Sequence, residues 1–539
     1  MSLLPIQNIA AKAGIDERFV EPYGKFKAKI DLSLVDELKD QPDGKLVLVT
    51  AITPTKAGEG KTTTSVALAD GFAKINQKAM LCLREPSLGP VFGLKGGATG
   101  GGKVTVEPQE DINLHFTGDM HALTSSINLI AAVLDNSIYQ GNPLGIDPEK
   151  VAWKRSLDMN DRALRHITIS EGDPKATPRK DEFQITVASE LMAILCLARS
   201  PEDFLARLEK IIVAYTYDDK PITVKDLQVT HAVMRLMKDA FKPNLVQTAE
   251  NNPAFIHGGP FANIAHGCSS IIATKLALKL APIVVTEAGF GADLGAEKFL
   301  DIKCQEAGVK PAAVVVVATI RALKLHGGIS YEDLKKENVE ALSKGICNLE
   351  AHIESVQKYG LPYVVAINHF ADDSEAEVAW LRAWCEKNHH RVAFLDGFEK
   401  GGEGAVELAK EVLDVLAKEP SNYHPLVTKE MPLKEKISTI CREIYGADGV
   451  EYTEAAEAQL RRYEELGFEH AYICMAKTPA SLSDDATVVG RPKGFKINVR
   501  EVRLSAGANF VVPLTGSILT MPGLPKIPAA VKMESLPWK

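Results

Sequence analysis

The chain has 539 residues, of which 45% are hydrophobic and 24% are charged, and its formal net charge is −8. This balance is ordinary for a globular protein and provides no basic surface for nucleic acid, so we expect small molecules or other protein chains as partners. The opening residues lack the pattern of a secretion signal, and no apolar run, residues 312–318 among them, is long enough to span a bilayer. We therefore expect a cytoplasmic protein whose eight cysteines are buried, reduced thiols.

Six short runs rich in Val, Ile and Leu predict buried strands, and helical patterns lie between several of them. This alternation predicts an α/β fold, in which a parallel sheet has helices on both faces. In chain order, we expect strands at residues 45–52, 79–83, 282–286, 312–318, 362–367 and 391–395, with helices at residues 62–75, 264–280 and 406–417.

Two parts of the chain depart from this alternation. Residues 89–249 begin with a glycine-dense loop and continue as polar sequence, with helices expected at residues 182–200, 201–216 and 224–241. Residues after about 420 are helical before a Pro- and Gly-rich end. We predict a discontinuous phosphate-loop domain at residues 1–88 and 250–350, an inserted, mostly helical domain at residues 89–249, and a smaller C-terminal α/β domain at residues 351–539.

The sequence TPTKAGEGKTTT, residues 53–64, lies between the first predicted strand and the following helix, which is the setting of a phosphate-binding loop. Backbone N–H groups at the start of that helix can hold phosphate oxygens, Lys61 can reach the terminal phosphates, and the Thr62 hydroxyl can hold Mg²⁺. The usual pattern has glycine where Thr55 stands, so we interpret this segment as a variant loop. We name residues 55–62 the first glycine loop and expect nucleotide contacts from Thr55, Lys56, Ala57, Gly58, Glu59, Gly60, Lys61 and Thr62.

Two further segments follow the second predicted strand, which we expect to lie next to the first. Arg84 comes directly after that strand and can make a bidentate contact with an oxyanion, although a salt bridge with Glu85 is the alternative. Residues 93–103, GLKGGATGGGK, are named the second glycine loop. Such glycine density suits a lid or a phosphate nest, or alternatively a disordered linker. The hydrophobic sequence that follows favours a packed loop.

Three titratable residues stand in the sequence DINLHFTGDMHA, residues 111–122. His115, Asp119 and His121 lack the spacing of a metal site, and no third ligand of the usual kind is evident nearby. We therefore favour polar structural roles or substrate contacts over zinc binding.

Together these segments resemble the formate–tetrahydrofolate ligase family, also called formyltetrahydrofolate synthetase, in its monofunctional bacterial form. The resemblance extends over nearly the whole chain, and VATIRALKLHGG, residues 317–328, is highly specific to that family. It implies that the chain uses ATP to join formate to tetrahydrofolate, giving 10-formyltetrahydrofolate, ADP and phosphate through formyl phosphate. It also implies activation by a monovalent cation, K⁺ or NH₄⁺, and a homotetramer.

The resemblance assigns roles to residues around the expected nucleotide site. Lys61 and Arg84 would hold the transferred phosphate and the formyl phosphate, and Thr62 would serve Mg²⁺. Phe290 and Gly291, in the segment EAGFGAD, would lie near the adenine.

The resemblance also places the folate. The pterin ring would stack between Phe370 and Phe398, so the C-terminal domain would contribute the folate pocket. Tryptophan is usual in the family where Phe398 stands, and since phenylalanine offers less area and no indole N–H, we expect weaker folate binding. Asp119 or His121 is our hypothesis for the group that accepts the proton of the N10 amine.

Two other functions would share the first glycine loop. One is another ATP-dependent ligase that forms an acyl phosphate or carboxylates an amine, similar to dethiobiotin synthetase. The other is a regulatory nucleotide switch. The first would not need the two phenylalanines or the sequence VATIRALKLHGG, and the second would turn over ATP slowly regardless of formate or folate. The dependence of ADP release on formate and on tetrahydrofolate separates all three.

Overall fold

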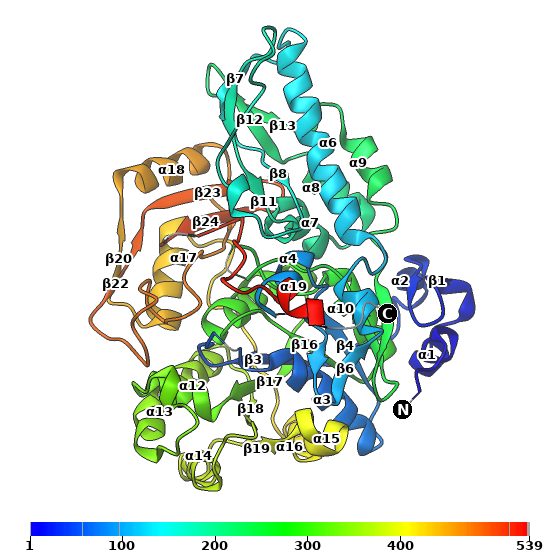
Figure 1. The fold of residues 1–539 in the computed structure, drawn as a ribbon, viewed down its shortest axis with the longest axis vertical. Coiled ribbons are helices and arrows are strands. Elements are labelled where there is room, and N and C mark those ends of the chain that lie inside the picture. Colours follow the sequence, from blue (N-terminus) through cyan, green and yellow to red (C-terminus); the bar gives the residue numbers. More distant parts are fainter. Residues whose placement is uncertain (1, 57, 96, 263, 517, 536–539) are drawn as a thin grey trace.

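The computed structural model describes residues 2–56, 58–95, 97–262, 264–516 and 518–535, and one large sheet lies at its centre (Figure 1). Within these residues, twelve strands form this sheet. Its main path runs β1 (Val20–Pro22), β2 (Ala28–Ile30), β14 (Asn244–Thr248), β15 (Pro253–Ile256), β4 (Ala79–Leu83), β16 (Ile283–Glu287), β3 (Lys45–Ala51), β17 (Pro311–Ala318), β18 (Tyr363–Asn368) and β19 (Val392–Leu395). Off this path, β6 (Val104–Glu107) pairs with β14, and β5 (Gly100–Gly101) pairs with β6. Neighbouring strands from β15 to β19 are parallel, which confirms the predicted α/β class.

The six predicted strands all form, and their ends lie within one residue of the expected positions. They are buried because helices cover both faces of the sheet. In β3, Val47 and Val49 belong to one hydrophobic core, whereas Leu46 and Leu48 belong to the other. This division follows from the strand geometry, since successive side chains point to opposite faces.

Helices α3 (Lys61–Lys74) and α16 (Val406–Lys418) pack on one face of the sheet, and α10 (Ile271–Leu280) packs on the other. Phe72 of α3 lies in the first core and Leu276 of α10 in the second. Helix α10 begins later than the expected residue 264 because Ser270 caps it. The Ser270 hydroxyl accepts a hydrogen bond from the N–H of Ala273 at 3.0 Å.

The part of the chain between β6 and β14 rises above the sheet in Figure 1. It combines the expected helices with short strands that we did not expect, and its standing as an inserted domain stays a prediction. Residues 212–216, expected to end a helix, are rich in β-branched and aromatic side chains and form a strand that pairs on both sides. The unit contains α6 (Asp119–Tyr139), α7 (Glu190–Leu197), α8 (Pro201–Leu208), α9 (Thr230–Leu236), β7 (Ile146–Val151), β12 (Ile212–Thr216) and β13 (Pro221–Thr223), with smaller elements between them.

The predicted boundary at residue 351 falls inside the central sheet. Between β17 and β18 lie α12 (Ile320–His326) and α13 (Val339–Lys358), and Val316 of β17 pairs in register with Val365 of β18. Strands β18 and β19 therefore belong with β3 rather than with a separate C-terminal domain. The rest of the division into domains stays a prediction. Later elements include α17 (Leu433–Ile440), α18 (Glu454–Glu465), β23 (Glu501–Ser505), β24 (Phe510–Leu514) and α19 (Ala529–Lys532).

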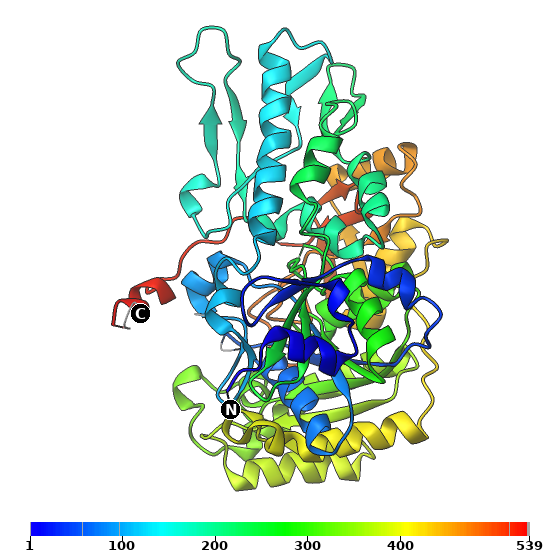
Figure 2. The same cartoon turned by 90° about the vertical axis from the view of Figure 1, so that its right-hand side faces the viewer.

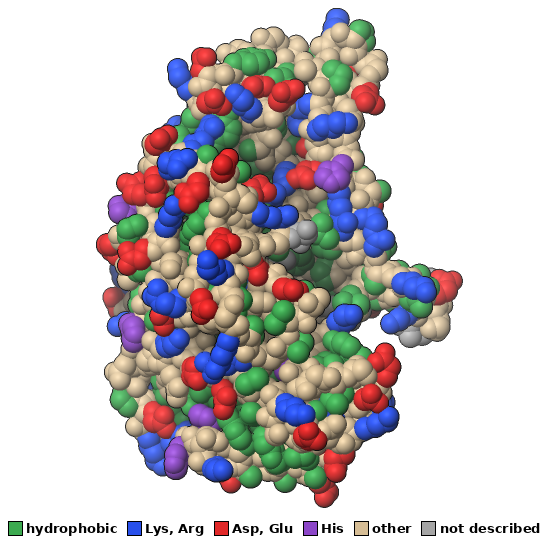
Figure 3. All heavy atoms as spheres, turned by 90° about the vertical axis from the view of Figure 1, so that its left-hand side faces the viewer, with side chains coloured by type: hydrophobic (Ala, Val, Ile, Leu, Met, Phe, Trp, Pro, Cys, Tyr) green, Lys and Arg blue, Asp and Glu red, His purple; other side chains and the backbone are tan. Residues whose placement is uncertain are grey.

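One face of the molecule mixes the two signs of charge. On the face in Figure 3, Lys and Arg side chains lie among Asp and Glu side chains, and the surface is hollowed between the upper unit and the body. Figure 2 shows the last segment of the chain, which carries α19, projecting from the side of the molecule. Across the described ranges, no helix has both the length and the apolar character that a membrane crossing requires.

Candidate active site

The first glycine loop connects β3 to α3 at the carboxyl end of the sheet. Gly58 and Gly60 have φ angles of 76° and 75°, a left-handed conformation that favours glycine. Thr55 does not have a positive φ, so the position where the usual pattern has glycine does not need one here. The N–H of Thr55 donates to the Glu59 carboxylate at 2.7 Å, and its C=O accepts from the N–H of Gly58 at 3.0 Å. Ala57, an expected contact, lies outside the described residues.

Side chains from distant parts of the sequence hold the first glycine loop in place. Glu59 is only 1% exposed, and its carboxylate also accepts a hydrogen bond from the Thr319 hydroxyl. The side-chain amide of Asn368, the last residue of β18, donates to the Glu59 carbonyl at 3.0 Å. The N–H of Lys56 donates to the Tyr331 hydroxyl at 3.1 Å. The position of the loop is therefore set by the segment that follows β17 and by the last residue of β18.

We predicted that Arg84 and the first glycine loop follow neighbouring strands. This is wrong, because β16 lies between β4 and β3. The last residue of β16, Glu287, connects them. Its carboxylate accepts a hydrogen bond from the Thr62 hydroxyl at 2.9 Å and lies 3.6 Å from the Arg84 guanidinium, so the ion pair of Arg84 is with Glu287 rather than with Glu85. A Cβ atom on Gly289 would lie 2.9 Å from Nη1 of Arg84, so this glycine leaves room for the guanidinium.

Glu287 is a residue that sequence reasoning missed. The sequence feature that could have indicated a role for Glu287 is its position directly after a predicted strand, at the start of EAGFGAD. We connected that segment only with the adenine. The structure brings together Thr62, Arg84 and Glu287 from three separate segments. Oxygen atoms of a hydroxyl and a carboxylate beside a phosphate-type loop form a donor set that suits Mg²⁺. The Lys61 side chain, which is partly exposed, starts from the first turn of α3.

Phe290 and Gly291 lie against the end of β3. Phe290 has a φ of 57°, which is unusual for a bulky residue and is a form of backbone strain that occurs at functional sites. A Cβ atom on Gly291 would lie 2.7 Å from Oδ1 of Asp293 and 3.2 Å from the carbonyl oxygen of Ile52. The segment that we expect near the adenine is therefore packed directly on the strand that leads into the first glycine loop.

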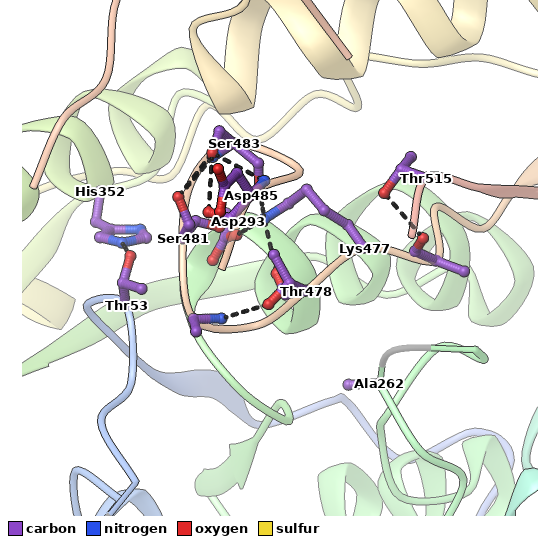
Figure 4. A network of polar contacts seen from close by, with 12 residues as sticks. Thr53, Ala262, Asp293, His352, Lys477, Thr478, Ser481, Ser483, Asp485 and Thr515 are labelled. Atoms are coloured by element: carbon purple, nitrogen blue, oxygen red, sulfur yellow. Dashed lines mark hydrogen bonds and ion pairs between the residues drawn. The ribbon is translucent and has the colours of Figure 1, made fainter. Parts of the chain in front are cut away.

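A buried ion pair lies behind this segment (Figure 4). The Lys477 ammonium is 3.0 Å from the Asp293 carboxylate, and both side chains are almost fully buried. Lys477 also donates to backbone carbonyls of Thr478, Ser481 and Ser483. Burial lowers the pKa of Lys477, and the Asp293 carboxylate opposes that shift. Sequence reasoning gave Lys477 no role and missed this contact.

Thr53, just before the first glycine loop, is held by two residues of α13, of which Figure 4 shows His352. Its hydroxyl lies 3.0 Å from Nε2 of His352 and accepts a hydrogen bond from the Asn348 side chain at 2.9 Å. Burial lowers the pKa of His352 to about 4, so this imidazole is neutral near pH 7. Helix α13 thereby fixes the path of the chain into the loop.

Phe370 stands two residues after the end of β18. Its N–H donates to the Asp373 carboxylate at 2.9 Å, which fixes the turn after the strand. One face of its ring is covered by the guanidinium of Arg321, whose central carbon lies 3.7 Å from the ring centroid. Phe370 therefore sits at the same edge of the sheet as Asn368 and the first glycine loop.

Phe398 lies in α15 (Gly397–Lys400), after β19, and is 47% exposed. The second glycine loop packs directly against it. A Cβ atom on Gly101 would lie 3.0 Å from the Phe398 ring, and one on Gly102 would lie 2.2 Å from the Phe398 carbonyl oxygen. The N–H of Lys103 donates to that carbonyl at 2.9 Å. Residues 101–103 thus form a packed loop rather than a disordered linker.

A family model described as Formate–tetrahydrofolate ligase matches residues 1–536. The chain belongs to this family. The activity implied by the sequence resemblance is therefore confirmed: this formate–tetrahydrofolate ligase joins formate to tetrahydrofolate in an ATP-dependent reaction of one-carbon metabolism.

In this ligase, the two residues suggested as proton acceptors have different surroundings. Asp119, at the start of α6, is buried and forms an ion pair with Lys29 at 2.8 Å, and its second oxygen accepts from Asn244 at 2.8 Å. His121 is exposed, and its Nε2 lies 3.5 Å from the Ser125 hydroxyl. The contacts of Asp119 favour a structural role, and proton transfer by either residue stays a prediction.

Proposed function

We propose that the ligase first phosphorylates formate and then transfers the formyl group to tetrahydrofolate, at the rim formed by the ends of β3, β4, β16, β18 and β19. The observation that carries this proposal is the convergence of the Thr62 hydroxyl and the Arg84 guanidinium on the Glu287 carboxylate. Ligands of open parallel sheets bind beyond the carboxyl ends of the strands, where these groups lie.

The first step places ATP on the first glycine loop. Backbone N–H groups around Gly58 and Gly60 and at the start of α3 would hold the phosphates, with Lys61 at the terminal phosphate. Thr62 and Glu287 would hold Mg²⁺, directly or through water, and the ion supplies positive charge beside the phosphates. Phe290 and Gly291 would border the adenine.

The chemistry explains the need for a phosphate. A formate oxygen attacks the terminal phosphorus, the bond to the bridging oxygen breaks, and ADP leaves. In the resulting formyl phosphate, phosphate is a far better leaving group than the oxide of formate. The N10 amine attacks the formyl carbon, the C–O bond to phosphate breaks, and the amine proton passes to a base. Arg84 and Lys61 would stabilise the negative charge on the transferred group in both steps.

The folate would bind between Phe370 and Phe398, with the pterin stacked on their rings. Both residues follow neighbouring parallel strands, since β18 pairs with β19. The exposed face of Phe398 is available for such stacking, and its backbone is fixed by the second glycine loop. Activation by K⁺ or NH₄⁺, a homotetramer and a cytoplasmic location remain predictions.

ADP release with and without formate and tetrahydrofolate tests this function. We expect release to require formate and, for turnover, tetrahydrofolate, and a short-lived acyl phosphate to be trapped by hydroxylamine when folate is omitted. Lys61→Ala should lower kcat at least about 100-fold, since it removes a charge that acts on the transferred phosphate. The matched control is Lys410→Ala, at an exposed position of α16, which should keep normal activity. ADP release that ignores both substrates would favour the nucleotide switch instead.

A further inference from the structure

The sequence VATIRALKLHGG identified the family, but the proposed reaction gives no role to its arginine. Arg321 lies in the first turn of α12, immediately beyond the Thr319 cap. Its guanidinium makes two contacts in different parts of the site. Nη2 donates a hydrogen bond to the carbonyl of Gly58 in the first glycine loop, and the planar group lies over the ring of Phe370 at 3.7 Å.

These contacts differ from those of an ordinary surface arginine. Nε of Arg321 is buried and has no hydrogen-bond partner among the described residues. Burying a donor without a partner is unfavourable, so the stacking and the contact with Gly58 must outweigh that cost. A guanidinium over an aromatic face is attractive, and its rigid plane transmits orientation better than a lysine ammonium would.

We propose that Arg321 is a positioning residue that couples the nucleotide site to the folate site. This inference rests on the proposed function, in which the first glycine loop binds ATP and Phe370 stacks on the pterin. Gly58 sets one edge of the guanidinium plane, and that plane sets the tilt of the Phe370 ring. Because Arg321 covers one face of Phe370, the pterin takes the opposite face. Phosphates bound at the loop therefore favour the ring orientation that binds folate.

Coupling of this kind is reciprocal, so each ligand should tighten the binding of the other by the same factor. The experiment measures the Kd of tetrahydrofolate with and without saturating ADP, and the Kd of ADP with and without tetrahydrofolate. In the unchanged ligase we expect the second ligand to bind about 5-fold tighter or more. In Arg321→Met the factor should fall below about 2-fold, while each ligand still binds alone.

Matched variants make the result specific. Arg442→Met replaces an exposed arginine that pairs with Glu443, and it should keep the full coupling factor. Phe370→Leu removes the ring through which Arg321 acts, so it should lose the coupling with ADP affinity retained. Adding Arg321→Met to Phe370→Leu should then change the coupling no further. Arg321→Lys, which keeps the charge but not the plane, supplies the same test if Arg321→Met does not fold.

The outcomes separate the two proposals. Absence of coupling in the unchanged ligase, or full coupling in both Arg321 variants, overturns the role of Arg321 and leaves the reaction untouched. ADP release that does not depend on formate overturns the proposed function instead. Loss of coupling in the Arg321 and Phe370 variants, with Arg442→Met normal, supports the positioning role.

Discussion

The two glycine loops lie at the same end of the sheet but are held by different means. The first is fixed by side chains from later parts of the chain, above all by Thr319 and Asn368 acting on Glu59. The second is fixed by close backbone approach, since Gly101 and Gly102 lie where a side chain would meet Phe398. A loop of the first kind tolerates a non-glycine residue such as Thr55, whereas a loop of the second kind requires glycine at the points of contact.

The largest expected effect concerns the helix that carries the first loop. Asp70 of α3 is buried, and burial raises its pKa to about 7, although Thr248 and Asn252 donate hydrogen bonds to it. Because the pKa of Asp70 is higher in the folded state than in the unfolded state, its contribution to the free energy of unfolding is fully present below the unfolded pKa near 4. That contribution is lost as pH rises through the folded pKa of about 7. Asp70→Asn should remove this loss, worth up to about 4 kcal/mol above pH 7.

Urea unfolding from pH 4 to pH 8 measures that change. The stability of Asp70→Asn relative to the unchanged ligase should rise between pH 4 and pH 7 and level off above pH 8. Asp40→Asn, at an exposed aspartate, should show no such rise. A difference that stays constant with pH would contradict the assigned pKa.

The second prediction breaks the side-chain support of the first loop. Glu59→Gln replaces a carboxylate that accepts from both Thr55 and Thr319 with a neutral amide that can accept fully at only one oxygen. Loss of one charge-assisted hydrogen bond costs about 2 kcal/mol, so the KM for ATP should rise about 30-fold. The KM for tetrahydrofolate should change much less. Glu386→Gln, on the exposed side of α14 (Glu375–Lys387), serves as the control.

The third prediction breaks the backbone fit of the second loop. Gly102→Ala puts a methyl group into space held by Phe398, at a φ of 60°. Such overpacking costs about 1–3 kcal/mol, so the KM for tetrahydrofolate should rise about 10-fold with the KM for ATP nearly unchanged. Gly172→Ala also has a positive φ, but no atom lies within 4 Å of the added Cβ, and it should leave both constants unchanged. Equal changes in the KM for tetrahydrofolate from Gly102→Ala and Gly172→Ala would contradict a role for packing against Phe398.

The smallest expected effect concerns folate binding at Phe398, against which the second glycine loop packs. Phe398→Trp enlarges the exposed ring that we assign to the pterin and adds an indole N–H. The additional stacking area should lower the KM for tetrahydrofolate about 3-fold, without changing the KM for ATP. Fluorescence of the new indole, quenched on folate binding, provides an independent readout. A ring buried away from the ligand would show neither change.

Much of the candidate site could be predicted from local sequence patterns. The first glycine loop, Arg84 and the two phenylalanines each stand directly after a predicted strand, so their approach to one sheet edge followed from the parallel topology. Glu287 could not be assigned in the same way. Its importance depends on β16 lying between β4 and β3, and strand order is not encoded in the spacing of residues along the chain.

The sequence by itself determined the family, the class of fold and the positions of six of the twelve strands described in the central sheet, because buried runs of Val, Ile and Leu between turn-forming residues are local signals. Only the tertiary structure decided which strands are neighbours, which buried charges pair and what holds each glycine loop. Thr319 contacts Glu59 across 260 residues of sequence, and Arg321 contacts Gly58 across 263 residues. Contacts of that kind depend on chain packing, and no local pattern specifies them.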